Sequence, residues 1–186
     1  MKTKNILLIG GSGFVGGHVA RRLAALGHRL TVPTRHRERA RHLIVLPTVE
    51  VVETNVHDEA RLTELVAGQD AVINLIGILH SRYGLPYGRD FARAHVELPR
   101  KIAAACRAAG VRRLIHVSAL NADVSGPSQY LRSKGEGEAV LRAAEQSLDL
   151  TIFRPSVIFG AEDSFLNLFA RLQRLLEENP QDKQIR

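Results

Sequence analysis

Gly10-Gly11-Ser12-Gly13-Phe14-Val15-Gly16, near the N-terminus, decides the expected fold of this chain. The stretch directly follows the apolar run Ile6-Leu7-Leu8-Ile9 and opens an amphipathic helical pattern over about 14–26. Glycines at its first, fourth and seventh positions allow a tight turn, close approach of a diphosphate, and close packing of helix on strand. A diphosphate would sit on the free N–H groups of the helix N-terminus, and the Ser12 hydroxyl could add a donor. Strand, glycine loop and helix in this order predict binding of a dinucleotide.

Outward from this loop, short apolar runs alternate with helical patterns. Several runs are apolar throughout, as in a sheet that helices cover on both faces. Regular alternation of this kind predicts a parallel α/β sheet with right-handed crossovers. The expected strands are Asn5–Ile9, Arg29–Thr34, Glu50–Thr54, Ala71–Leu75, Arg112–Ser118 and Asp149–Arg154, and the expected helices cover about 14–26, 37–45, 59–67, 90–109 and 130–147.

Length and composition indicate a globular protein with one main domain. The chain has 186 residues, of which 45% are hydrophobic and 24% charged, and this excludes a disordered chain, a collagen and a disulfide scaffold. A single cysteine, Cys106, cannot form an internal bridge and fits a reducing compartment. The 26 Lys and Arg residues against 19 Asp and Glu give a net charge of +7, which favours an anionic ligand.

Three other kinds of site or segment are not expected. No stretch approaches the ~20 apolar residues of a membrane span, since Asn74 and Gly77 interrupt the run Ala71–Leu79. The eight histidines show neither H-x-H nor H-E-x-x-H spacing, so no metal site is expected. No nucleic-acid surface is expected either, because aromatic residues make up only 5% of the chain and none lies among the arginines of 35–41.

The residues after the second expected strand bear on the choice between NADP(H) and NAD(H). NAD-binding folds usually place an Asp or Glu there to accept from the ribose 2′-hydroxyl, whereas this chain has Thr34-Arg35-His36-Arg37. A guanidinium at Arg35 or Arg37 matches a 2′-phosphate, so NADP(H) is favoured over NAD(H). The alternative is that these arginines form the solvated face of a short helix, and this is preferred for Arg39 and Arg41.

Two further strand ends are expected to line the dinucleotide. After the third strand, Val56 could pack on the adenine ring, and Asn55 or Asp58 could accept from its exocyclic amine. Asp58 has a second, compatible role as a helix N-cap, which is preferred. The fourth strand ends in Asn74-Leu75-Ile76-Gly77, where a small residue lets the backbone approach the ribose and nicotinamide.

Tyr130-Leu131-Arg132-Ser133-Lys134 contains a candidate catalytic pair, because a spacing of four places Tyr130 and Lys134 on one helix face. A free phenol has a pKa of about 10, and a nearby ammonium lowers it, so Tyr130 could exchange a proton with a carbonyl or alcohol. Lys134 could also hydrogen-bond the nicotinamide ribose, and Ser118, after the preceding strand, could hold the substrate oxygen. The alternative is an amphipathic helix with an exposed lysine and a half-buried tyrosine.

Together these motifs resemble those of the atypical or extended short-chain dehydrogenases/reductases, the NAD(P)-dependent epimerase-like branch. The glycine loop, the 74–77 turn, the Tyr130 and Lys134 pair and Arg154-Pro155-Ser156-Val157-Ile158-Phe159-Gly160 carry this resemblance. A narrower resemblance is to the nucleotide-binding accessory subunit group of respiratory complex I and its bacterial relatives. It rests on Val117-Ser118-Ala119-Leu120-Asn121-Ala122 and on Tyr130-Leu131-Arg132-Ser133-Lys134-Gly135-Glu136-Gly137-Glu138.

The resemblance implies an α/β, Rossmann-like, doubly wound parallel sheet with flanking helices, in an NAD(P)-binding domain over residues 1–160. Residues 161–186 are then expected to start a C-terminal lobe, with a helix over about 164–178 and a polar tail. The substrate lobe is expected to be truncated. The resemblance also places His95 where the family commonly has an Asn.

Two main functional classes follow. One is an NADP(H)-preferring oxidoreductase or epimerase that uses Tyr130, Lys134 and Ser118 on a small-molecule carbonyl, sugar or quinone-like substrate. The other is a non-catalytic, cofactor-binding subunit or assembly factor of a respiratory or ubiquinone-related complex, and a cofactor sensor is a lesser third class. The expected location is cytoplasmic, with peripheral attachment to the inner membrane if a partner complex provides it. The expected cofactor contacts are Gly10, Ser12, Gly13, Phe14, Val15, Gly16, Arg35, Asn55, Val56, Asn74, Gly77 and Lys134.

Overall fold

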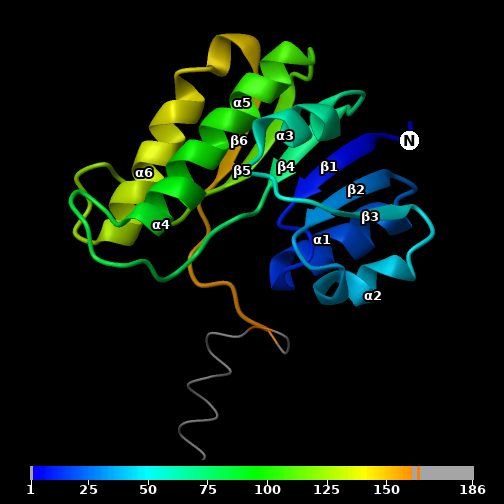
Figure 1. Ribbon diagram of the computed structural model, residues 1–186, viewed down its shortest axis with the longest axis horizontal. Helices are drawn as coiled ribbons and strands as arrows, with labels where there is room; N and C mark the ends of the chain where they lie inside the picture. The colour runs from blue at the N-terminus through cyan, green and yellow to red at the C-terminus, as the bar shows by residue number, and fades with distance from the viewer. Residues whose placement is uncertain (1, 161–162, 164–186) are drawn as a thin grey trace, which may run out of the picture. The chain divides into compact units, whose positions relative to one another are not determined.

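Six parallel strands form the sheet around which the protein is built (Figure 1). The computed structural model describes residues 2–160 and 163. The strand order is β3-β2-β1-β4-β5-β6, so the winding direction reverses between β1 and β4, as in a doubly wound Rossmann-like sheet. The strands are β1 (Asn5–Ile9), β2 (Arg29–Thr34), β3 (Val49–Glu53), β4 (Ala71–Asn74), β5 (Arg113–Val117) and β6 (Asp149–Phe153).

Helices cover the two faces of this sheet (Figure 1). One face carries α1 (Phe14–Ala25), the 3-10 turn η1 (Arg37–Ala40) and α2 (Arg41–Ile44). The opposite face carries α3 (Glu59–Val66), α6 (Gln129–Arg142) and one long helix made of α4 (Arg89–Phe91), the π-helical segment η2 (Ala92–Glu97) and α5 (Leu98–Ala108). A 3-10 turn, η3 (Glu145–Ser147), leads into β6.

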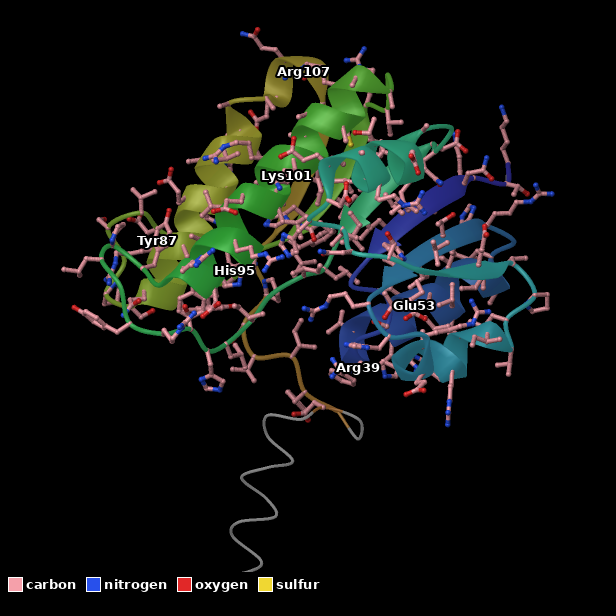
Figure 2. All side chains as sticks on the ribbon, in the orientation of Figure 1. Arg39, Glu53, Tyr87, His95, Lys101 and Arg107 are labelled. Carbon is pink, nitrogen blue, oxygen red and sulfur yellow. The ribbon has the colours of Figure 1, made fainter. Side chains whose placement is uncertain are left out.

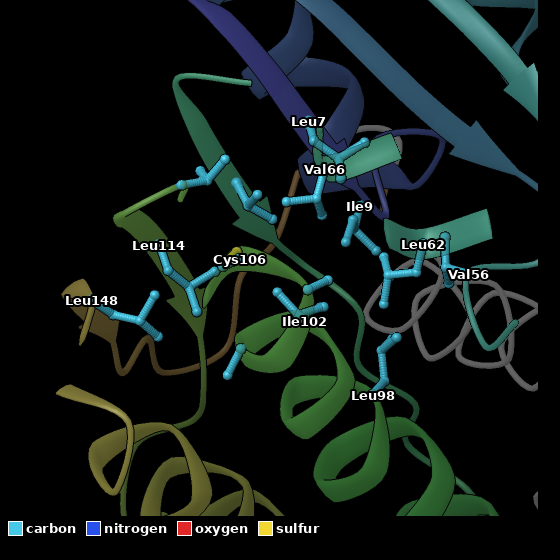
Figure 3. Packing of buried hydrophobic residues seen from close by; sticks show 14 of the residues in the cluster. Leu7, Ile9, Val56, Leu62, Val66, Leu98, Ile102, Cys106, Leu114 and Leu148 are labelled. Carbon is cyan, nitrogen blue, oxygen red and sulfur yellow. The ribbon is translucent and has the colours of Figure 1, made fainter. Parts of the chain in front are cut away.

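Alternation along β1 explains why both faces need a cover. Leu7 and Ile9 belong to the apolar cluster under α3, α5 and α6, whereas Ile6 and Leu8 belong to the cluster under α1 and α2. Leu7, Leu8 and Ile9 are fully buried. Figure 3 shows Leu7 and Ile9 in the first cluster, beside side chains of the long helix. The all-apolar strand therefore fills two cores at once, which confirms the expected doubly covered sheet.

The expected elements agree closely with the structure in the part of the chain that it describes. The strand bounds differ by at most one residue at each end. The pattern over 37–45 forms a 3-10 turn and a single helical turn, and the last expected helix ends at Arg142. The expected helix over 164–178 lies outside the described residues.

The described residues contain neither a helix that could span a membrane nor a group of side chains that could hold a metal ion. None of their helices combines the length and the apolar character that crossing a bilayer requires. No group of three or more His, Cys, Asp or Glu side chains within residues 2–160 and 163 is placed to hold a metal ion.

Candidate functional site

A cavity of about 500 Å³ opens along the carboxyl ends of the strands. Its walls come from the β1–α1 loop, from the segments after β2, β3 and β4, and from the α4–η2 helix. It therefore lies at the reversal of strand order, where open α/β sheets bind their ligands. The lining residues are Gly10, Ser12, Gly13, Pro33, Thr34, Arg35, His36, Arg39, Thr54, Asn55, Val56, His57, Leu75, Ile76, Gly77, Ile78, Asp90, Arg93 and Ala94.

The three spaced glycines of the β1–α1 loop meet different conditions. Gly10 has φ +84°, a left-handed conformation that favours glycine, which confirms the tight turn. At Gly16 a Cβ would lie 2.3 Å from the carbonyl oxygen of Gly10, which confirms the expected close packing of helix and strand. Gly13 has extended backbone angles, and a Cβ there would meet only that same oxygen, at an ordinary 3.4 Å. Neither sterics nor backbone strain explains the glycine at position 13.

Helix α1 begins without the side chains that usually complete a helix N-terminus. Among residues 2–160 and 163, no side chain caps it, and its first turn holds no acidic residue. In contrast, Asp58 accepts from two backbone N–H groups of α3, as expected of an N-cap, and Ser128 accepts from the Leu131 N–H of α6. No side chain in the described part of the chain therefore offsets the positive end of the α1 dipole through a cap or a first-turn carboxylate. Phe14, Val15 and Gly16, also expected as cofactor contacts, are not among the residues that line the cavity.

Arginines from two walls make the cavity cationic. Arg35 and Arg39 lie on the β2 side, and Arg93 lies on the α4–η2 side. Asp90 is the single carboxylate among the lining residues. Sequence reasoning missed Arg93, because nothing local to that helix shows that it faces the glycine loop across the cavity.

The structure differs from the expectation for Arg37, one of the arginines after β2. Arg37 does not line the cavity, because its Nη1 donates to the carbonyl oxygen of Val51 at 3.0 Å. Arg39 is exposed within the short η1 turn, as expected of a solvated face, and it also lines the cavity. Figure 2 shows it beside the short helices that follow β2. The η1 turn determines both positions, since a 3-10 turn directs successive side chains differently from an α-helix.

The segment after β3, where adenine contacts were expected, forms part of the cavity wall. Val56 is buried, lines the cavity and also belongs to the α3-side core. The Oδ1 atom of Asn55 accepts from the His57 N–H at 3.1 Å, and this bond shapes the turn. Burial, followed by the charges of Arg93, Lys101 and Arg35, lowers the pKa of His57. Its imidazole is therefore neutral at neutral pH and does not add to the positive charge.

Asn74 and Gly77, both expected as cofactor contacts after β4, occupy different positions in the structure. Gly77 lines the cavity, but Asn74 does not. The Asn74 Oδ1 atom accepts from the Ile76 N–H at 3.1 Å, and its Nδ2 lies 3.1 Å from Nδ1 of His116. The side chain of Asn74 therefore shapes the turn that presents Gly77, and its polar atoms are already paired within the protein.

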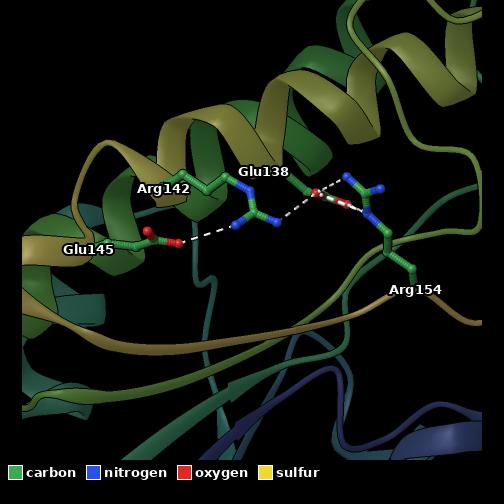
Figure 4. A network of polar contacts seen from close by, with 4 residues as sticks. All are labelled: Glu138, Arg142, Glu145 and Arg154. Atoms are coloured by element: carbon green, nitrogen blue, oxygen red, sulfur yellow. Dashed lines mark hydrogen bonds and ion pairs between the residues drawn. The ribbon is translucent and has the colours of Figure 1, made fainter.

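Lys134 is buried against the end of β5, so the alternative of an exposed lysine is wrong. Its Nζ donates to the carbonyl oxygen of Val117 at 2.8 Å. Burial lowers the pKa of Lys134 to about 8, although the nearby Glu138 carboxylate opposes the shift. Glu138 is buried too and accepts a bidentate contact from Arg154, with a further ion pair from Arg142 (Figure 4). This network holds α6, and with it Lys134, against the chain after β6.

Tyr130 and Ser118 differ in how the protein surrounds them. Burial raises the pKa of Tyr130, which is opposite to the direction expected from a neighbouring ammonium. The reason is that Lys134 points to Val117, so burial decides the phenol's pKa. Ser118 is buried, and its Oγ has no hydrogen-bond partner within the described residues. Neither Ser118 nor Tyr130 is among the residues that line the cavity.

Comparison with known proteins places this chain in a family. A family model described as NAD(P)H-binding matches residues 10–165. NADH dehydrogenase (ubiquinone) 1 alpha subcomplex subunit 9, mitochondrial, of Mus musculus is 36% identical over 173 residues, which are 91% of this chain and 44% of that protein. Ceramide reductase of Caulobacter vibrioides is 33% identical over 159 residues, which are 86% of this chain and 48% of that protein.

A solved structure shows the same fold. The Bordetella bronchiseptica enzyme WbmH, in complex with NAD+, superimposes with a TM-score of 0.76 at 20% identity, over 96% of this chain and 64% of that one. The chain spans less than half the length of the two curated relatives. With the glycine loop, the reversed strand order and a family match over residues 10–165, the chain belongs to the NAD(P)H-binding family and has the fold of the extended short-chain dehydrogenases/reductases.

Proposed function

We propose that this chain binds NADP(H) in preference to NAD(H), with the diphosphate at the N-terminus of α1 and the 2′-phosphate beside Arg35. Gly13 carries the diphosphate part of this proposal, because neither its backbone angles nor its protein neighbours require a glycine. A diphosphate lying against the helix N-terminus does require one, since a side chain would keep the phosphate from the N–H groups. Arg35 and Arg39 on the β2 side, where an NAD-binding fold usually has a carboxylate, support the choice of NADP(H).

Arg35→Met is expected to weaken NADPH binding by about 10- to 100-fold, because a hydrogen bond to a charged group contributes about 1.5–3 kcal/mol. NADH binding should stay within about twofold, because NADH has no 2′-phosphate for Arg35 to contact. Calorimetric titration of the purified chain with both nucleotides measures the two affinities. Arg37→Met is the matched control, since the Arg37 guanidinium binds Val51 outside the cavity and its loss should leave the ratio of affinities unchanged. Equal weakening of both nucleotides by Arg35→Met would contradict the proposed selectivity.

We further propose that the chain supplies the catalytic residues of a carbonyl reductase. A bound nicotinamide supplies the hydride. Burial keeps the Tyr130 phenol protonated at neutral pH, so its Oη holds the proton that a carbonyl oxygen must gain on reduction. The unpaired Ser118 hydroxyl would hold that oxygen, and Lys134 would hydrogen-bond the nicotinamide ribose. The name of the Caulobacter relative, a reductase, favours reduction over epimerisation. The substrate class stays a carbonyl, sugar or quinone-like compound.

The second candidate is a cofactor-binding subunit or assembly factor without turnover. It is supported by 36% identity to a subunit named for an NADH dehydrogenase complex. In that case NADP(H) would stabilise the fold, and the chain would bind its complex at the surface of the membrane.

Tyr130→Phe separates the two candidates. If the chain is a reductase, the change should lower kcat by about 10²- to 10⁴-fold, as loss of a general acid does, with NADPH affinity unchanged. Activity is followed by NADPH absorbance with a panel of aldehydes, ketones and quinones. Tyr83→Phe, on an exposed tyrosine, is the control and should change nothing. A wild-type chain that binds NADPH but turns over no carbonyl, with Tyr130→Phe indistinguishable from it, would favour the subunit.

A further inference from the structure

His95 lies where three parts of the candidate site meet. It belongs to the π-helical segment η2, within the long helix beside α6 (Figures 1 and 2). Its side chain is 1% exposed. A Cβ placed on Gly77 would lie 4.0 Å from both His95 Nε2 and Lys134 Nζ. His95 thus stands directly behind the glycine that lines the cavity after β4.

Two hydrogen bonds determine which ring nitrogen of His95 carries the proton. The backbone N–H of Ile78 donates to Nε2 at 3.0 Å, so Nε2 must be unprotonated. The ring has a single proton, since burial, assisted by the charge of Lys134, lowers the pKa of His95 to about 3. That proton is therefore on Nδ1, which lies 2.8 Å from the Ser133 Oγ and donates to it.

Ser133 extends the chain of hydrogen bonds to the candidate catalytic tyrosine. Having accepted from His95, the fully buried Ser133 hydroxyl donates to the Tyr130 carbonyl oxygen at 2.8 Å. The series therefore runs in one direction, from the Ile78 N–H through His95 and Ser133 to the Tyr130 carbonyl oxygen. Two aromatic rings also contact the imidazole. It stacks on Phe91, with 5.3 Å between ring centroids, and it meets Tyr130 in a T-shaped arrangement, with 5.6 Å between centroids.

We propose that His95 is a positioning residue, which fixes the Gly77–Ile78 backbone relative to Tyr130 and Lys134 through Ser133. The adenosine half of a dinucleotide lies towards β2 and β3, so the nicotinamide half lies towards Gly77, where a Cβ would be 4.0 Å from Lys134 Nζ. His95 therefore sets the distance between the wall that holds the nicotinamide and the helix that carries the proton donor. This role rests on the proposed function only for its effect on the cofactor, whereas the hydrogen-bond series stands without it.

The first arm of the test needs no nucleotide. Nitrogen NMR of the histidine-labelled protein should show a buried, neutral imidazole with the proton on Nδ1, assigned to His95 by its absence in His95→Phe. Ser133→Ala removes the acceptor for that proton and should shift the His95 nitrogen resonances and the Ile78 amide resonance. A proton on Nε2 in the wild type, or an Ile78 amide unmoved by Ser133→Ala, would overturn the proposal.

The second arm compares NADPH with 2′-phospho-ADP-ribose, which has the same phosphates but no nicotinamide. His95→Phe keeps an aromatic ring and loses both hydrogen bonds. It should lower the affinity for NADPH about tenfold, which corresponds to the free energy of about one hydrogen bond. Affinity for 2′-phospho-ADP-ribose should stay within about twofold. Ser133→Ala should weaken NADPH in the same direction, and the double variant should lose no more than His95→Phe alone, because both changes break one series.

The outcomes separate a failed inference from a failed proposed function. Equal weakening of the two ligands by His95→Phe would mean that His95 only supports the fold, and would overturn the inference. If the wild-type chain binds neither ligand, the proposed function fails, and the NMR arm alone decides whether the hydrogen-bond series exists. If His95→Phe does not fold, Ser133→Ala, a small buried change, can be used for both the NMR measurement and the two affinity measurements.

Discussion

Gly13→Ala is expected to weaken binding of NADPH and NADH by at least about 100-fold, because a phosphate loses charge-assisted hydrogen bonds that contribute about 1.5–3 kcal/mol each. The Cβ would stand at the N-cap of α1, on a residue that lines the cavity. Inside the protein it would meet only the Gly10 carbonyl oxygen, at 3.4 Å, so the melting temperature should fall by no more than a few degrees, the cost of replacing glycine by alanine at an N-cap. Calorimetric titration and thermal unfolding of the same preparation measure both effects.

Gly16→Ala should give the opposite pattern, which makes it the control. Its Cβ would lie 2.3 Å from the Gly10 oxygen and 2.5 Å from the Gly11 Cα, so helix α1 would have to move off β1. The fold is therefore expected to lose stability before any effect on the ligand can be measured. If Gly13→Ala binds both nucleotides normally, the diphosphate does not lie at the N-terminus of α1. If it instead lowers the melting temperature as Gly16→Ala does, Gly13 is a structural glycine.

The glycine loop and the sheet could be predicted from the sequence because their causes are local. Gly10 has a left-handed backbone, and Gly16 touches the loop itself, so spacing alone identifies both. The alternation of Leu7 and Ile9 with Ile6 and Leu8, all apolar, indicates two covered faces without knowledge of the partners. The N-cap role of Asp58 is local as well, because its carboxylate accepts from the N–H groups of Ala60 and Arg61, only two and three residues further along the chain.

The remaining features of the site depend on contacts between distant segments, so local patterns do not reveal them. The η1 turn brings Arg39 rather than Arg37 to the cavity, and no residue pattern distinguishes the two. Arg93 reaches the cavity only because the long helix packs beside the end of β4. The pKa of Tyr130 follows its burial, which the four-residue spacing to Lys134 does not contain. The sequence could not show that the Asn74 side chain is already hydrogen-bonded, because its partner His116 lies 42 residues further along the chain.

Gly137→Ala is the second change with a large expected effect, and it acts on the contact between the two helices that carry the site. Alanine in a helix interior is normally favoured over glycine by about 1 kcal/mol. At Gly137, however, the Cβ would lie 2.0 Å from the His95 carbonyl oxygen, a backbone atom that no side-chain rotation can move away. Forced overpacking costs about 1–3 kcal/mol or more, so we expect a net loss of about 2 kcal/mol in the free energy of unfolding and a melting temperature lower by about 4–8 °C.

Gly17→Ala, in α1, is the matched control for the Gly137 change, because there the Cβ would meet mainly the end of an exposed side chain, His42 Nε2 at 2.8 Å. That imidazole can turn aside, so helix propensity should dominate and stability should stay equal or rise by up to about 1 kcal/mol. Thermal and denaturant unfolding of both variants measure the difference. A Gly137→Ala protein as stable as the wild type would mean that α6 can move away from η2 at little cost. The close approach of the two helices would then not be what holds Tyr130 beside His95, and the hydrogen bonds of Ser133 would have to hold it alone.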